Sequence, residues 1–121
     1  LLFLERLMNH VYIDPLEIAQ DMSKLLKHEK QCDLVICLSH LGYEYTKTNQ
    51  ISDVKIAKNT QDIDLIIGGH THTFLEKPTE IENVVGKTVL VNQVGCHGLY
   101  LGRVDFYLEE SQKNTGEPLS I

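Results

Sequence analysis

The chain has 121 residues, of which 42% are hydrophobic and 23% are charged, and its formal net charge is -6. This composition is typical of one globular domain or of part of a larger one, and it excludes the disordered and fibrous classes. The negative charge, with no cluster of Lys and Arg, argues against a nucleic-acid polymer as a partner. No apolar run approaches the roughly 20 residues that a membrane-spanning helix needs, so no membrane span is predicted.

The chain begins with an apolar segment, residues 1–8 (LLFLERLM), in which Leu1 stands in place of an initiator Met. This segment has neither the basic start nor the small-residue cleavage site of a secretory signal. We therefore interpret the chain as a segment of a longer protein. Because an exposed apolar patch favours association between copies, self-association through residues 1–8 is predicted.

The first secondary-structure element is predicted to be a helix from Pro15 to Glu29. Asp14 suits the N-cap, Pro15 suits the first helical position, and Glu17 completes a spacing similar to a capping box. Apolar residues then recur at helical spacing. Residues 33–40 (DLVICLSH) form a short aliphatic run, which predicts a strand buried on both faces.

The rest of the chain continues the alternation of helix and strand. Residues 52–59 can form a short helix, and residues 63–69 repeat the pattern of a buried strand. The order helix, strand, helix, strand favours a layered α/β arrangement. Two further strands are predicted at residues 87–95 and 99–110, joined by a glycine-containing turn, and the polar residues 111–121 are interpreted as a tail.

Three of the six histidines, His40, His70 and His72, fall just past the ends of the two predicted central strands. Ligand sites in open α/β sheets gather at the carboxyl ends of strands, so the two histidine loops are expected to converge. A neutral imidazole is a common ligand of zinc, iron, nickel and manganese. A single histidine after a strand is more often an ordinary loop or core residue, and it is the combination on consecutive strands that predicts a metal site.

The two histidines of the second loop are separated by one residue and preceded by two glycines. In an extended stretch, residues i and i+2 point to the same side, roughly 6 to 7 Å apart. His70 and His72 are therefore expected to reach two neighbouring cations, which two-metal hydrolases hold about 3.5 to 4 Å apart. Gly68 and Gly69 are expected to adopt unusual backbone angles and to let the chain approach the ions closely.

The ligands of a two-metal site are incomplete in this chain. Three imidazoles do not fill two coordination shells, which normally include bridging carboxylates. Asp62 and Asp64 precede the second central strand and are expected at its opposite end. His97, next to Cys96 on the turn after a strand, could approach the same edge, although a surface or packing role is favoured.

Other polar residues near the predicted site have simpler interpretations. Turn hydrogen bonding is favoured over substrate contact for Asn92 and Gln93. Tyr43 and Tyr45 either line the pocket or cover apolar surface. Solvent exposure is predicted for His28, which falls in the last turn of the first helix.

Three segments together resemble a known family: CDLVICLSHLGYEY, DIDLIIGGHTHTFL, and VGKTVLVNQVG followed by GLYLGRVDFYL. They closely resemble the second half of the calcineurin-like metallophosphoesterase domain, in its bacterial 5'-nucleotidase branch, from about Tyr12 to Leu108. The resemblance implies an α/β fold, namely the second half of a four-layer α/β/β/α sandwich. It divides the chain into residues 1–110, the C-terminal half of the domain, and the tail 111–121.

The resemblance also implies roles for the three histidines. His40 and His70 would bind one divalent metal ion, and His72 would bind its neighbour, with Zn, Mn, Fe or a similar metal at the two positions. The first half of the family's domain supplies the motifs D-x-H, G-D-x-x-D and G-N-H-[DE], which bring the bridging Asp, an Asn ligand and the general-acid His. None of these motifs occurs in the chain, so no catalytic residue is assigned to it.

The function implied by the resemblance is hydrolysis. The parent protein is expected to be a two-metal-dependent phosphoesterase that acts on nucleoside 5'-monophosphates or related small phosphate esters, and export to the periplasm is expected for this branch. The chain alone is expected to be nearly inactive. The alternative is a non-catalytic metal-binding or interaction fragment, because the general acid and the bridging carboxylate are missing.

Overall fold

A computed structural model describes residues 13–108 of the chain. The elements, in chain order, are α2 (Pro15–Lys24), the π-helical turn η1 (Leu25–Glu29), β1 (Ile36–Leu38), α3 (Asp53–Asn59), β2 (Leu65–Ile67), β3 (Thr79–Glu82) and β4 (Thr88–Asn92). The apolar segment 1–8 and the tail 111–121 lie outside the described residues, so self-association and the domain boundaries stay predictions.

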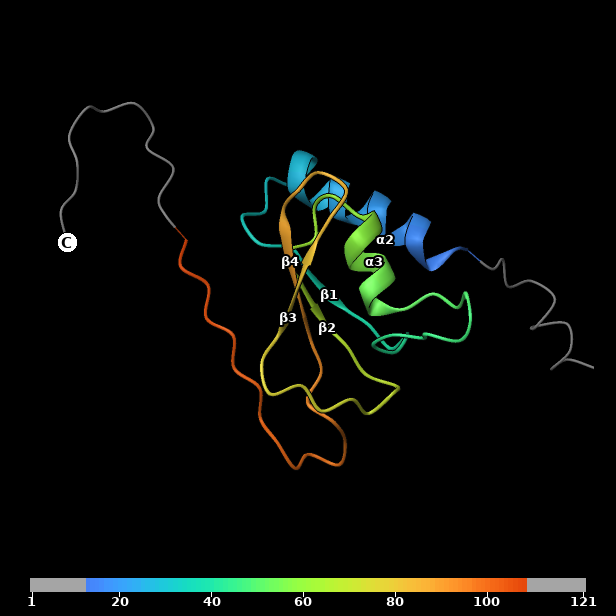
Figure 1. Cartoon of the computed structure of the whole chain (residues 1–121). Coiled ribbons are helices and arrows are strands. Elements are labelled where there is room, and N and C mark those ends of the chain that lie inside the picture. The colour runs from blue at the N-terminus through green and yellow to red at the C-terminus, as the bar shows by residue number, and fades with distance from the viewer. Residues whose placement is uncertain (1–12, 109–121) are drawn as a thin grey trace, which may run out of the picture.

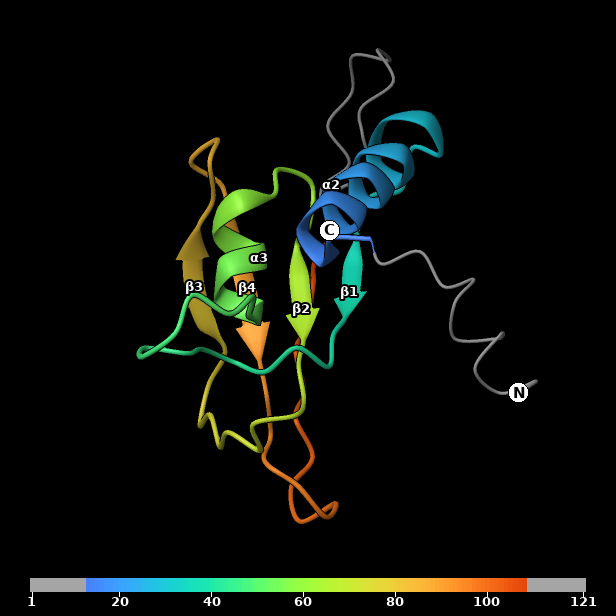
Figure 2. The ribbon, with the colours of Figure 1, turned by 90° about the vertical axis from the view of Figure 1, so that its right-hand side faces the viewer.

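The four strands form one sheet in the order β1-β2-β4-β3. β1, β2 and β4 are parallel to one another, and β3 is antiparallel to β4. The arrows of the three parallel strands point the same way in Figure 2, and both helices, α2 and α3, lie in front of the sheet in that view. The predicted layered α/β fold is therefore confirmed, with the carboxyl ends of three strands at one edge (Figure 1).

Side-chain caps begin both helices where the sequence predicts. The Leu16 amide donates to Asp14 Oδ1 at 2.7 Å, with proline at the first position of α2. The Lys55 amide donates to Ser52 Oγ at 3.3 Å at the start of α3. These bonds satisfy amides that have no partner within the helix. The first helix spans the predicted range, although its last five residues are wound as a π-helix.

The hydrophobic core lies between the sheet and the helices. It consists of Ile56, Ala57, Ile63, Ile66, Val89 and Val91. In β2, Ile66 is fully buried and Leu65 is 4% exposed, whereas Ile67 at the end of the strand is 45% exposed. One face of the sheet is covered by α2 and α3, whereas the other has no helix on it among the described residues and is exposed at Ile36, Leu38 and Ile67.

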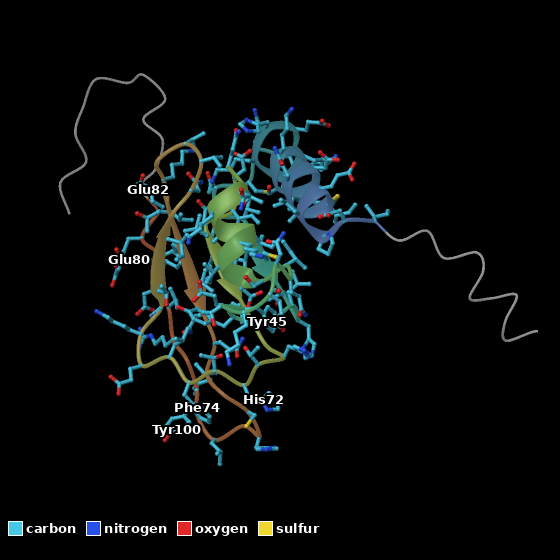
Figure 3. The ribbon with its side chains drawn as sticks, turned by 45° about the vertical axis from the view of Figure 1, so that its right-hand side comes forward. Tyr45, His72, Phe74, Glu80, Glu82 and Tyr100 are labelled. Carbon is cyan, nitrogen blue, oxygen red and sulfur yellow. The ribbon has the colours of Figure 1, made fainter. Side chains whose placement is uncertain are left out.

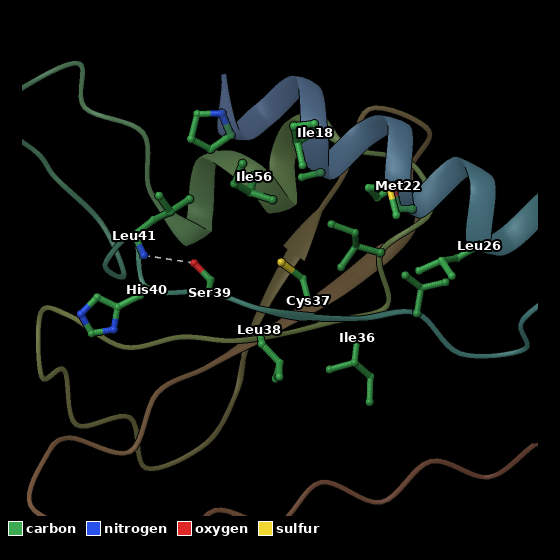
Figure 4. A pocket seen from close by; sticks show the side chains of 15 residues that line it. Ile18, Met22, Leu26, Ile36, Cys37, Leu38, Ser39, His40, Leu41 and Ile56 are labelled. Atoms are coloured by element: carbon green, nitrogen blue, oxygen red, sulfur yellow. Dashed lines mark hydrogen bonds between the residues drawn. The ribbon is translucent and has the colours of Figure 1, made fainter. Parts of the chain in front are cut away.

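The prediction that the first strand is buried on both faces is wrong. In β1, Cys37 faces α2, whereas Ile36 and Leu38 point to the opposite side of the strand (Figure 4). Leu38 is 80% exposed. The aliphatic run reflects two apolar faces, but the helices among residues 13–108 cover only one of them.

The prediction of a strand at residues 99–110 is also wrong for residues 99–108, the part that the structure describes. Residues 99–108 have no strand assignment, and Leu101 is 97% exposed. A strand requires a hydrogen-bonded partner, and within residues 13–108 none pairs with this segment. Its alternating apolar residues therefore do not by themselves produce a strand.

The sequence analysis missed β3, whose residues Thr79–Glu82 alternate polar and apolar weakly. This strand forms because it pairs with β4 through a short hairpin. In the hairpin turn, Asn83 Oδ1 accepts hydrogen bonds from the amides of Val85 and Lys87 at 3.0 and 2.9 Å. The side chain thus replaces main-chain partners in the turn.

An ion pair and a hydrogen bond connect η1 to the segment before β2. Lys27 Nζ lies 3.2 Å from Asp64 Oδ2, and His28 Nε2 lies 3.1 Å from Asp62 Oδ2. The predicted exposure of His28 is confirmed. The two aspartates lie at the amino end of β2, as predicted, and so at the opposite end of the strand from His70.

Two adjacent isoleucines of β2 test which face of the sheet stabilises the fold. Ile66→Ala should lower the free energy of unfolding by about 2 to 5 kcal/mol, because it leaves a cavity in the core. Ile67→Ala should cost roughly 1 kcal/mol or less, because that side chain already contacts solvent. Urea denaturation of both variants measures the difference, and equal losses would contradict the assignment of the core.

Candidate functional site

The carboxyl ends of β1 and β2 bring two of the predicted histidines together. The rings of His40 and His70 have centroids 5.2 Å apart and are inclined at 71°. The Ser39 amide donates to the Ile67 carbonyl at 2.9 Å, which continues the strand pairing up to the site. Both histidines are exposed to solvent. The predicted convergence of the two loops is therefore found for this pair.

The expectation of an extended backbone at the His-Thr-His sequence is wrong. His70 has φ of +69° and His72 has φ of +52°, so both residues lie in the left-handed region. Their rings consequently lie near different neighbours. The centroids of the His72 and His97 rings are 6.2 Å apart, and Figure 3 shows His72 at the end of the molecule where Phe74 and Tyr100 also lie. The loop presents one imidazole to His40 and the other to His97.

The two glycines before His70 provide space rather than unusual backbone angles, which corrects the prediction. Neither glycine has a positive φ. A Cβ at Gly68 would collide with Asp53 Oδ2, and a Cβ at Gly69 would lie 3.1 Å from His40 Nδ1. The absence of side chains here lets the loop pass close to α3 and to His40.

A buried glutamine holds the second histidine loop. Gln93 follows β4 and is 2% exposed. Its Nε2 donates to the Gly69 carbonyl at 2.7 Å, and its Oε1 accepts from the Thr73 amide and from Thr71 Oγ1. The predicted hydrogen-bonding role of Gln93 is found, but its partners lie in the site loop rather than in its own turn.

Thr71 connects the two histidine loops. Its Oγ1 accepts a hydrogen bond from the Tyr43 amide at 3.0 Å and also donates to Gln93 Oε1. A Cβ at Gly42 would meet Thr71 Cγ2 at 2.8 Å, so glycine permits this approach. The Tyr43 hydroxyl lies 2.9 Å from Thr79 Oγ1, and the Tyr45 hydroxyl donates to the Leu41 carbonyl. The hydroxyls of both tyrosines therefore hydrogen-bond within the protein.

A buried carboxylate lies beneath the first loop. The hydroxyl of Ser39 donates to Asp53 Oδ1, whereas Asp53 Oδ2 is buried without a hydrogen-bond partner among the described residues. Burial raises the pKa of Asp53 above its ordinary value of 3.8, while the Ser39 bond and the charge of His40 act in the opposite direction. The sequence analysis missed this residue because a Ser-Asp pair at a helix start looks like ordinary capping.

An apolar groove of about 380 Å³ runs between α2 and β1 and ends near His40. Ile18, Met22 and Leu26 of α2 line one wall, and Cys37 faces them from β1 (Figure 4). Burial, and secondarily the charge of Asp53, raise the pKa of the Cys37 thiol. The groove is lined mainly by apolar side chains, and the potential metal ligands in its wall are Cys37 and, at its end, His40.

The three histidines fit only part of a metal site. Exposed imidazoles are suitable metal ligands, and the rings of His40 and His70 lie close to each other. Within residues 13–108, however, no group of three or more His, Cys, Asp or Glu side chains is arranged to hold an ion. The assignment of His40, His70 and His72 as metal ligands stays a prediction.

Comparison with known proteins finds nucleotide phosphoesterases among the relatives of this chain. The chain is 36% identical over 100 residues to the trifunctional nucleotide phosphoesterase protein YfkN of Bacillus subtilis, covering 83% of this chain and 6% of that protein. It is 34% identical over 115 residues to an apyrase of Tabanus yao, covering 83% and 20%. No family model matches the chain.

Solved structures with the same fold are nucleotidases. The 5'-nucleotidase precursor of Thermus thermophilus matches with a TM-score of 0.58 and 34% identity, over 69% of this chain and 17% of that one. The NAD nucleotidase of Haemophilus influenzae matches with a TM-score of 0.55 and 28% identity, over 68% and 16%. The chain thus spans 6% to 20% of the length of these relatives.

The fold is that of the metallophosphoesterases, and both of the solved structures described above are nucleotidases. The chain belongs to the 5'-nucleotidase-type metallophosphoesterases, of which it forms a segment. The relatives include insect and snake proteins as well as bacterial ones, so the resemblance is broader than the bacterial branch. Among residues 13–108, no helix is long and apolar enough to cross a membrane.

The close packing of Gly68 against Asp53 can be tested by a double-mutant cycle. Gly68→Ala should destabilise the fold by roughly 1 to 3 kcal/mol, because the added methyl group collides with the carboxylate. In an Asp53→Ala background the same change should cost at least about 1 kcal/mol less. Chemical denaturation of the four proteins measures this coupling. Gly69→Ala, which faces His40 instead, is the control and should cost the same in both backgrounds.

The pH dependence of stability tests the buried carboxylate. Because the folded pKa of Asp53 is raised, its ionisation favours the unfolded chain, and the wild type should lose stability as pH rises through that pKa. Asp53→Asn should lack this component, so its stability relative to wild type should improve between pH 4 and pH 7. Urea denaturation at both pH values checks the sign, with the exposed Asp33→Asn controlling for net charge. A relative decline of Asp53→Asn over the same interval would contradict the assignment.

Proposed function

We propose that residues 1–110 form the C-terminal half of the catalytic domain of a phosphoesterase that hydrolyses nucleoside 5'-monophosphates or related small phosphate esters. The observation that carries the proposal is the convergence of His40 and His70, 5.2 Å apart, at the carboxyl ends of two parallel strands. The relatives support it, because their names describe nucleotide phosphoesterase, apyrase and 5'-nucleotidase activities.

The three exposed histidines would hold two divalent cations in this proposal, with His40 and His70 on one ion and His72 on the other. When bound, such cations supply Lewis-acid stabilisation of the phosphoryl oxygens. The contribution of this chain is to hold the imidazoles in fixed orientations at one edge of the sheet. The bridging carboxylate and the proton donor would come from D-x-H and G-N-H motifs outside the chain.

The partly exposed face of the sheet supports the placement in a larger domain. Ile36, Leu38 and Ile67 are exposed on strands of the described chain. In a four-layer α/β/β/α sandwich, the second sheet would pack on this face and bury such side chains. Export from the cell is proposed from the family resemblance, and the Thermus thermophilus neighbour is described as a precursor.

A second candidate function is a non-catalytic metal-binding or interaction fragment. It is favoured by the incomplete set of ligands among residues 13–108. Under this alternative the histidines bind metal, but no phosphate ester is hydrolysed even in the longer polypeptide. Metal binding and turnover must therefore be measured separately.

Metal titration tests the role of the histidines. The chain should bind Mn²⁺ or Zn²⁺ weakly in isothermal titration calorimetry, because three neutral ligands form an incomplete shell. His70→Ala should abolish the binding, whereas His28→Ala, at the opposite end of the sheet, should retain it. Equal binding by wild type and His70→Ala would refute the metal assignment.

Turnover distinguishes the two candidate functions. The longer polypeptide, which the proposal requires to carry upstream Asp-x-His and Gly-Asn-His motifs, should hydrolyse p-nitrophenyl phosphate and a nucleoside 5'-monophosphate in the presence of the metal. Metal binding without hydrolysis would favour the non-catalytic alternative.

A further inference from the structure

We propose that Gln93 is the positioning residue of the site: its side-chain amide sets the conformation of the loop that carries His70 and His72. The proposal rests on the proposed role of these histidines as metal ligands. Gln93 itself is buried and is not a ligand in the proposal. Its role is to determine the positions of the imidazole rings of His70 and His72.

The side-chain amide of Gln93 lies inside the loop and hydrogen-bonds to its main chain, as a neighbouring strand would. Its donor reaches the carbonyl of Gly69, the residue before His70, and its acceptor reaches the amide of Thr73, the residue after His72. One planar group thus hydrogen-bonds to the main chain on both sides of the His-Thr-His sequence. The distance between these two attachment points is set by the rigid amide.

Main-chain hydrogen bonds close the loop around this side chain. The Gly68 amide donates to the Asn92 carbonyl at 2.9 Å, and the Leu75 amide donates to the Gln93 carbonyl at 3.0 Å. The Gly95 amide donates to the Thr73 carbonyl at 2.8 Å. Both ends of the loop are therefore tied to the end of β4, and Gln93 fills the space between them.

The backbone of the two histidines requires such support. Non-glycine residues in the left-handed region are strained, and they persist only where the surrounding structure determines their conformation. His70 and His72 both have positive φ within a stretch of three residues. The hydrogen bonds to Gln93 begin one residue before this stretch and end one residue after it.

The influence of Gln93 extends to the other histidine loop. Its Oε1 accepts from Thr71 Oγ1 at 3.0 Å, and this hydroxyl oxygen in turn accepts from the Tyr43 amide at 3.0 Å. Tyr43 belongs to the segment that follows His40. Gln93 therefore links, through Thr71, the loops that bring His40 and His70 to a centroid separation of 5.2 Å.

The chain offers a matched control in Asn83, another buried amide that makes three hydrogen bonds. Asn83 donates to the Gln61 carbonyl at 3.1 Å and accepts from the amides of Val85 and Lys87. It lies in the β3–β4 turn, at the opposite end of the sheet from the histidines. Loss of its amide removes as many hydrogen bonds as the loss of the Gln93 amide, without touching the site loop.

Gln93→Met and Asn83→Leu, each close in shape to the native residue, separate positioning from general stability. Both variants should unfold at a lower urea concentration than the wild type, because buried main-chain groups lose their partners. Only Gln93→Met should change the nuclear magnetic resonance signals of the backbone and rings of His70 and His72 in the metal-free folded chain. It should also weaken Mn²⁺ binding by about tenfold to a hundredfold, the range typical of groups that orient metal ligands.

A second variant separates the contact with Gly69 from the contact with Thr73, and it also replaces Gln93→Met in the test if that variant does not fold. Gln93→Glu keeps the length of the side chain and an acceptor for the Thr73 amide, but an ionised carboxylate cannot donate to the Gly69 carbonyl. Its spectral changes should therefore be larger at His70 than at His72. This comparison needs no metal.

The outcomes separate this inference from the proposed function. Unchanged histidine signals in both Gln93 variants, or equal changes in Asn83→Leu, would overturn the positioning role. If the wild type binds no metal but the Gln93 variants displace His70 and His72, the metal assignment fails while the positioning role of Gln93 stands.

Discussion

The hydrogen bonds between the buried amide of Gln93 and the loop after β2 are the constraint on which the site depends. They join residues far apart in the sequence, Gly69 and Thr73 on one side and the end of β4 on the other. Two histidines with positive φ are held between these contacts. The parallel strands bring the loops to one edge of the sheet, but the amide determines the conformation that the second loop adopts there.

The site is also built directly on the hydrophobic core. Asp53 begins α3, whose Ile56 and Ala57 pack against the sheet, and its carboxylate lies against Gly68 and accepts from Ser39. The helix that fills the core therefore also limits how the two loops can move. A carboxylate buried in this way costs stability, which is a common feature of functional sites.

The described segment presents surfaces that a single layer of helices does not cover. Ile36 and Leu38 are exposed on the edge strand β1, and an apolar groove lies between that strand and α2. The same edge carries His40. An edge strand that ends at an exposed histidine agrees with the proposed larger domain, since the chain spans only 20% and 17% of the length of two of its relatives.

The sequence by itself determined the elements whose signals are local. Capping by Asp14 locates the first helix, and the spacing of apolar residues locates the second. Aliphatic runs locate β1 and β2, and the ends of these runs locate His40 and His70, because periodicity and capping depend on neighbouring residues. Only the tertiary structure decided the rest. β3 forms because β4 is available to pair with it, whereas residues 99–108 have no such partner within the described chain. Likewise, the positive φ of His72 and the hydrogen bonds from Gln93 to the loop that carries His72 depend on contacts between distant segments, which no local pattern specifies.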